Sequence, residues 1–198
     1  MSRPVTRMAP ICLALWLAMA AGALAMDGVH VNVAELGNGI YSVRGSFTVQ
    51  APAPTVWRVL TDYDQLGSFV PSVKSSIVKK PAPNTIVVAQ ESTTQFLAIS
   101  KTMRVLLQLQ EEPHERIDFA DIGLQDFEHF AGSWMLQPAD DGIRVDYMAN
   151  AKPRIYLPFW GGSIMHDMVK GQLTHLKKEM LRRPTASADH SKSDRRAS

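Results

Sequence analysis

Apolar and polar residues alternate along much of the chain, and this period of two predicts β-strands with one face toward a core. The clearest alternation runs over residues 40–50 and again over residues 143–152. Shorter apolar runs beside turn-forming residues predict further strands at 75–80, 85–94, 99–110, 116–123 and 130–136. Residues 26–38 form a lead-in that can add an edge strand. The first clear strand is separated from the others by a segment with a different period.

That segment, residues 51–73, predicts two short helices in tandem. Pro52 and Pro54 end the preceding strand, because proline has no N–H to give to a ladder. Thr55 is the expected N-cap of the first helix, and Pro71 ends the second. The apolar positions of the pair are Val56, Trp57, Val59, Leu60, Leu66, Phe69 and Val70. Such a connection fits neither a hairpin nor a parallel crossover.

A longer helix is predicted over residues 162–181, with Ser163 as its N-cap and Pro184 beyond its end. One apolar stripe follows it at helical spacing and contains Met165, Met168, Val169, Gln172, Leu173, Leu176 and Met180. Helices and strands do not alternate along the chain, so a parallel sheet is not expected. The order of elements indicates an α+β fold, in which an antiparallel sheet wraps around the final helix.

The first residues form a different kind of segment, typical of a secretory signal peptide. Arg3 and Arg7 precede an apolar run over residues 8–23, and Ala23-Leu24-Ala25 matches a cleavage site. The alternative is a retained anchor, but the run is shorter than the roughly 20 residues that span a bilayer. We therefore expect cleavage after Ala25 and export to the periplasm. The expected organisation is a signal peptide at 1–25, one domain at 26–183 and a disordered polar tail at 184–198.

Composition then excludes several kinds of chemistry. The only cysteine, Cys12, lies in the leader, so the mature chain would have no disulfide, no thiolate nucleophile and no cysteine-ligated metal. Cleavage also removes Arg3 and Arg7, which leaves 19 basic residues against the 19 acidic ones. No basic face of the kind that binds nucleic acid is expected.

Three motifs resemble the START-like (SRPBCC) superfamily, and most closely its polyketide cyclase and coenzyme Q-binding branch. They are the stretch from Val56-Trp57 to Ser72-Val73, the run Phe127-Glu128-His129-Phe130-Ala131-Gly132-Ser133-Trp134, and Val145-Asp146-Tyr147. The resemblance covers roughly residues 41–181 and implies a helix-grip fold. In that fold a curved antiparallel sheet wraps around a long C-terminal helix, with two short helices after the first strand and a ligand cavity between sheet and helix.

The inward phase of the predicted elements gives the candidate lining of such a cavity. These residues are Val105, Leu107, Phe130, Trp134, Tyr147, Met165, Met168 and Val169. The alternative interpretation is that they form an ordinary core. Phe159 and Trp160, beside two glycines at the start of the last helix, suggest a mobile gate or a tip that touches a membrane. They would otherwise pack as a staple on the helix.

Signals for catalysis and for metal binding are weak. The polar candidates are Asp126, Glu128, His129 and Tyr147, but neighbours on a strand point to opposite faces, so Glu128 and His129 cannot act together. His129 is expected to face solvent, and no two histidines have metal-ligand spacing. No cofactor or catalytic residue is therefore assigned.

The sequence as a whole predicts a monomeric, non-enzymatic binder of a hydrophobic small molecule, a quinone or lipid, with possible transient membrane contact. A cyclase-like enzyme and an interaction protein with a filled core remain as alternatives.

Overall fold

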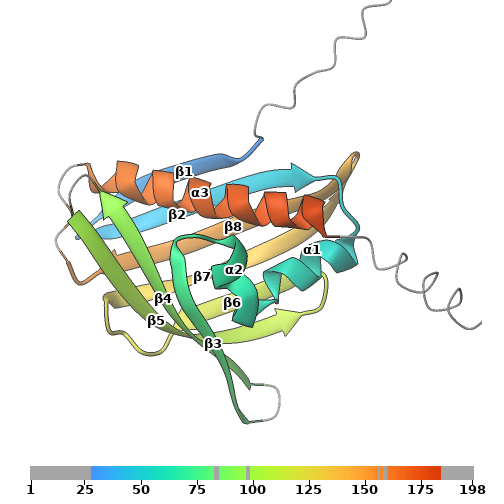
Figure 1. The fold of residues 1–198 in the computed structure, drawn as a ribbon. Helices are drawn as coiled ribbons and strands as arrows, with labels where there is room; N and C mark the ends of the chain where they lie inside the picture. The colour runs from blue at the N-terminus through green and yellow to red at the C-terminus, as the bar shows by residue number, and fades with distance from the viewer. Residues whose placement is uncertain (1–27, 83–84, 97–98, 156, 158–159, 184–198) are drawn as a thin grey trace, which may run out of the picture.

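Eight antiparallel strands form one curved sheet, and the long helix α3 lies across its inner face (Figure 1). This computed structural model describes residues 28–82, 85–96, 99–155, 157 and 160–183. The strands are β1 (His30–Gly37), β2 (Ile40–Val49), β3 (Val73–Ala82), β4 (Thr85–Phe96), β5 (Ile99–Glu112), β6 (Arg116–Asp121), β7 (Phe127–Ala139) and β8 (Gly142–Pro153). The helices are α1 (Ala53–Leu60), η1 (Tyr63–Gln65), α2 (Leu66–Phe69) and α3 (Gly161–Arg182).

The strand order is β1-β2-β8-β7-β6-β5-β4-β3, so β2 pairs with the last strand rather than with the next one. The segment α1–η1–α2 must therefore carry the chain from β2, near one edge, to β3 at the opposite edge. This explains why the sequence places two short helices where a hairpin turn would otherwise stand. The expected α+β helix-grip architecture is confirmed, and β1 is the edge strand anticipated in the lead-in.

Two predicted helix caps are wrong. Helix α1 begins at Ala53 after Pro52, so Thr55 lies inside the helix, is buried, and its hydroxyl has no hydrogen-bond partner among the described residues. Pro54 fits the first turn of this helix, because a backbone N–H at that position would have no partner within the helix. Helix α3 begins at Gly161, and the backbone oxygen of Trp160 accepts from Ser163 N at 3.1 Å. Ser163 is consequently a residue of the first turn.

Helix α3 packs most closely against β1 and β2, at one side of the sheet. Gly45 of β2 makes this approach possible, because a Cβ there would collide with the Leu173 side chain. Leu173, Leu176 and Met180 are fully buried. The helix therefore covers one half of the inner face tightly and stands further from the strands of the other half.

Ion pairs fix the C-terminal end of α3 to the short helices. Glu179 is buried and accepts from Arg182 Nε at 2.7 Å and from Arg183 Nε at 2.8 Å. Arg183 also contacts Asp62 at 2.7 Å, and its guanidinium lies over the Phe69 ring at 5.3 Å from the centroid. These arginines thus link three segments, a function that the sequence pattern did not reveal.

Several expectations concern residues outside the described part of the chain, namely the leader, the polar tail and Phe159. Within the described residues, no helix combines the length and the apolar character required to cross a bilayer.

Candidate ligand-binding site

The inner face of the sheet is buried unevenly from one end to the other. Toward the C-terminal end of α3, inward residues such as Leu109, Leu136 and Val145 are buried. Toward the start of α3, Phe130 and Met168 are only half-buried, although they pack against the same core. We call this second region the accessible inner face, and it consists of Val105, Leu107, Phe130, Trp134 and Met168.

A continuous row of aromatic rings crosses this region on β6, β7 and β8. The row runs Phe127–Phe130–Phe119–Tyr147–Trp134, with ring centroids 5.0, 5.3, 6.1 and 4.6 Å apart in that order. Tilted and stacked ring pairs of this kind contribute stabilising free energy in addition to that from burying their apolar area. Phe119 and Phe127 were not among the predicted site residues, although Phe119 alternates in phase with buried Ile117.

Gly132 creates the space in which this row forms. It lies between Phe130 and Trp134 on β7, and a Cβ there would collide with the Met148 carbonyl oxygen and lie 2.7 Å from the Phe119 ring. The ring of Phe119 therefore covers the glycine of the neighbouring strand, a device known to stabilise glycine in sheets.

Tyr147 places a polar atom inside this apolar row. The residue is 8% exposed, and burial alone raises the pKa of its phenol far above the ordinary value of 10.0. The described part of the chain supplies its hydroxyl with no hydrogen-bond partner. A neutral phenol in this setting is a hydrogen-bond donor available to a carbonyl or hydroxyl oxygen of a bound molecule.

Asp121 is a second polar group on the inner phase, and it was not among the predicted site residues. Its Oδ1 accepts from Leu106 N at 2.9 Å and from Gly123 N at 3.0 Å, where the β5–β6 ladder ends. Its Oδ2 is buried and has no partner among the described residues. The available signal was a lone carboxylate in the apolar phase after Ile117 and Phe119.

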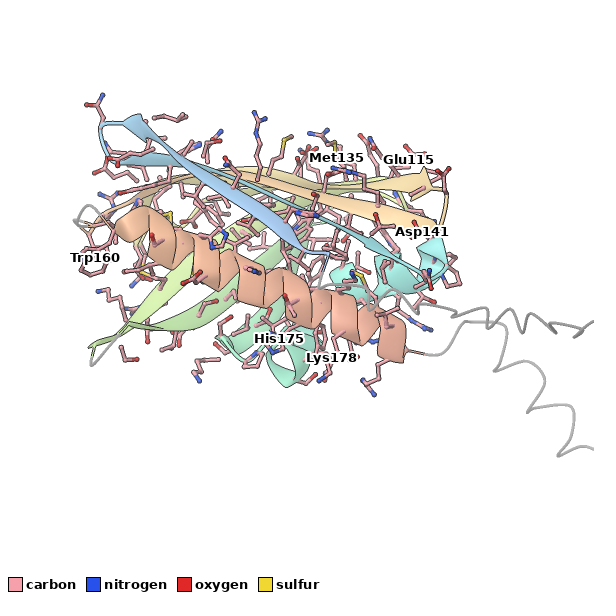
Figure 2. All side chains as sticks on the ribbon, turned by 90° about the horizontal axis from the view of Figure 1, so that it is seen from above. Glu115, Met135, Asp141, Trp160, His175 and Lys178 are labelled. Atoms are coloured by element: carbon pink, nitrogen blue, oxygen red, sulfur yellow. The ribbon has the colours of Figure 1, made fainter. Side chains whose placement is uncertain are left out.

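The remaining predicted lining residues differ in how deeply they are buried. Met165 and Val169 are buried core residues, whereas Leu107, Phe130, Trp134 and Met168 are half-buried at the edge of the core. Val105 is half-buried on β5 but lies outside the core cluster formed by the described residues. Trp160 is half-buried at the start of α3, where Figure 2 shows it at one end of the molecule.

The polar candidates of β7 do not form a catalytic group. A bulge between Phe127 and His129 interrupts the alternation, and both Glu128 and His129 are exposed. Glu128 pairs with Lys152, and Asp126 lies 3.5 Å from Arg104. Among the described residues no three His, Cys, Asp or Glu side chains gather as metal ligands.

These observations define a class: a helix-grip protein whose apolar inner face remains accessible at one end. A family model described as "Polyketide cyclase / dehydrase and lipid transport" matches residues 41–181. The chain belongs to this family. No curated protein matches the chain in sequence.

Solved structures show the same fold at low sequence identity. The STAR-related lipid transfer protein of Xanthomonas axonopodis is 19% identical, with 78% of this chain and 94% of that one covered and a TM-score of 0.65. Human STARD10 is 15% identical, with coverages of 79% and 71% and a TM-score of 0.64. The Zhui aromatase/cyclase of Streptomyces sp. R1128 is 18% identical, with coverages of 75% and 98% and a TM-score of 0.60. The shared feature is the fold.

Proposed function

We propose that the protein binds and carries a hydrophobic small molecule, a quinone or a lipid, without transforming it. The observation that carries this proposal is the aromatic row on the accessible inner face, which includes a Tyr147 hydroxyl with no hydrogen-bond partner among the described residues. Apolar area removed from water contributes about 25 cal/mol per Å². The half-buried rings of the row, Phe127, Phe130 and Trp134, still have such area to bury against a ligand. One hydroxyl is sufficient to orient a ligand that carries an oxygen acceptor.

The family description names lipid transport beside polyketide chemistry, which supports a carrier of this ligand class. The apparent leader, residues 1–25, supports a location in the cell envelope, where quinones and phospholipids are the abundant apolar molecules. We propose on this basis that the protein acts outside the cytoplasm, as a monomer.

Native mass spectrometry of the processed protein, followed by extraction of the bound molecule, tests the proposal. We expect one quinone or phospholipid per chain. An empty protein, with no thermal shift on addition of ubiquinone or phospholipid, contradicts it.

Tyr147→Phe sharpens this test. Loss of one net hydrogen bond lowers ligand affinity about two- to tenfold, while the thermal midpoint stays equal or rises because no protein hydrogen bond is lost. Tyr63→Phe is the matched control. The Tyr63 hydroxyl donates to Glu111 Oε1 at 2.6 Å, and Tyr63 is not part of the aromatic row. That control is expected to lose stability and keep ligand affinity.

A second candidate is a cyclase-like enzyme acting at the same face. The observation that favours it is the buried Oδ2 of Asp121, which has no partner within the part of the chain that the structure describes. Asp121 lies in the inward phase of β6, two residues from Phe119 of the aromatic row. If an aromatic polyketide were converted by the protein and Asp121→Asn abolished conversion without loss of binding, the carrier proposal would be replaced.

A further inference from the structure

Three large apolar side chains are exposed in two loops at the end of the sheet where α3 begins. Ile122 and Leu124 follow β6 and are 49% and 42% exposed, and Ile155 follows β8 and is 36% exposed. The two loops are joined, because Arg154 N donates to Asp126 O at 2.9 Å and Arg154 Nε donates to Leu124 O at 3.0 Å. The three side chains therefore belong to one hydrogen-bonded unit, which we call the apolar tip.

The backbone of Leu124 indicates that its side chain has a role outside the fold. Its φ is +47°, in the left-handed region that glycine and asparagine adopt easily and leucine adopts at a cost. Among the described residues, the other two non-glycine residues with positive φ are Asn38 and His114, and both belong to types enriched in this region. The exposed side chain of Leu124 does not offset this strain by packing in the core, so we look for an apolar contact outside the fold.

Charges around the apolar tip favour a phosphate-bearing surface. Of the carboxylates on and beside these loops, Asp126 pairs with Arg104 and Glu128 pairs with Lys152. Asp121 is buried and accepts from backbone N–H groups. Arg154 is exposed and uses only Nε within the described part of the chain, which leaves its terminal N–H groups for an anion. Lys101 at the start of β5 is also exposed and has no ion pair among the described residues. Arginine binds phosphate oxygens with matched geometry.

We propose that the apolar tip docks the protein on a phospholipid bilayer that contains anionic lipid, with Ile122, Leu124 and Ile155 inserted and Arg154 and Lys101 at the phosphates. Separate apolar side chains at loop ends, flanked by cations, match the layered chemistry of a bilayer surface. The accessible inner face lies toward this same end of α3, so docking would bring it near the membrane. The proposal rests on the loops and not on the identity of any ligand.

The opposite end of α3 offers the competing surface. Leu181 is 55% exposed there, beside Lys178 and Arg182, and α3 spans 22 residues, or about 33 Å, between the two ends (Figure 2). Leu181→Ser is therefore a matched control with similar exposure and similar charge. Leu124→Asn and Ile155→Ser test the apolar tip.

The measurement is co-sedimentation of the chain without residues 1–25, a segment that would bind vesicles by itself. Vesicles of phosphatidylcholine with phosphatidylglycerol are compared with phosphatidylcholine alone. We expect binding to the mixed vesicles that falls about tenfold in Leu124→Asn and in Ile155→Ser and is unchanged in Leu181→Ser. Leu124→Asn should have an equal or higher thermal midpoint, because its backbone strain is relieved; a merely structural role for Leu124 gives the opposite.

Two results overturn the proposal: a wild-type protein that binds neither vesicle, or a loss of binding confined to Leu181→Ser. The co-purified ligand is measured in the same variants. A protein that retains ligand but does not bind vesicles refutes the docking proposal and leaves the carrier function intact. A protein that binds vesicles but never holds ligand supports docking and refutes the carrier function.

Discussion

Asp121 shows how one side chain can complete a sheet that the backbone leaves unfinished. Its Oδ1 takes the place of a ladder carbonyl for Leu106 N and also binds Gly123 N. Asp121→Ala leaves these two N–H groups unpaired, and we expect the free energy of unfolding to fall by about 2 kcal/mol. Urea unfolding followed by circular dichroism measures this change.

Asp121→Asn is the control, because the amide oxygen keeps both hydrogen bonds and the amide nitrogen replaces the unpartnered oxygen. We expect it to lose less than half as much stability as Asp121→Ala. Equal losses would show that the negative charge, and not the two hydrogen bonds, is what stabilises this corner.

Pairing of β7 with its neighbours requires a residue without a Cβ at position 132. At Gly132 a Cβ would collide with the Met148 carbonyl oxygen and with the Ala149 backbone, so the strands themselves must move. We expect Gly132→Ala to lower the unfolding free energy by about 1–3 kcal/mol, the usual cost of overpacking, and to disturb the aromatic row.

Gly171 on α3 is the opposite case, because nothing lies within 4 Å of its added Cβ. Gly171→Ala should raise the unfolding free energy by about 0.5–1 kcal/mol through helix propensity. Thermal unfolding of the two variants checks the pair. A stabilising Gly132→Ala would contradict the packing described for β7.

At the scale of the whole molecule, the Glu179 network makes stability depend on acid. Hydrogen bonds from Arg182, and then from Arg183, hold the pKa of this carboxyl below its ordinary value of 4.5. A lowered folded-state pKa stabilises the protein above 4.5, and this contribution is lost as the pH falls from 4.5 through the folded value. Acidification should therefore release the end of α3 from α1 and α2.

Glu179→Gln tests this dependence. We expect it to be less stable than wild type at neutral pH. The difference should narrow as the pH falls from 4.5 through the lowered folded-state pKa, because wild-type Glu179 becomes protonated over that range. Unfolding by urea at a series of pH values gives the measurement. A difference that stays constant with pH would assign the effect to packing and not to charge.

The sequence by itself determined the class of fold. Alternation with period two, the tandem helices after Pro52 and the apolar stripe of the last helix are local signals, and each follows from the geometry of its own element. The inward phases of Phe130, Trp134 and Tyr147 were predicted for the same reason. Helix starts were less predictable, because Thr55 and Ser163 match the chemistry of a cap while Pro52 and Trp160 occupy those positions.

Only the tertiary structure decided which inward residues remain accessible. That depends on where α3 lies over the sheet, and its position is fixed by contacts distant in sequence, such as Gly45 with Leu173 and Arg183 with Asp62. The burial of Tyr147, the two backbone hydrogen bonds of Asp121 and the hydrogen bond from Arg154 to Leu124 also depend on contacts between elements, which the pattern of one strand does not specify. Periodicity predicts which face of its element a side chain occupies, whereas packing between elements decides which groups the side chain contacts there.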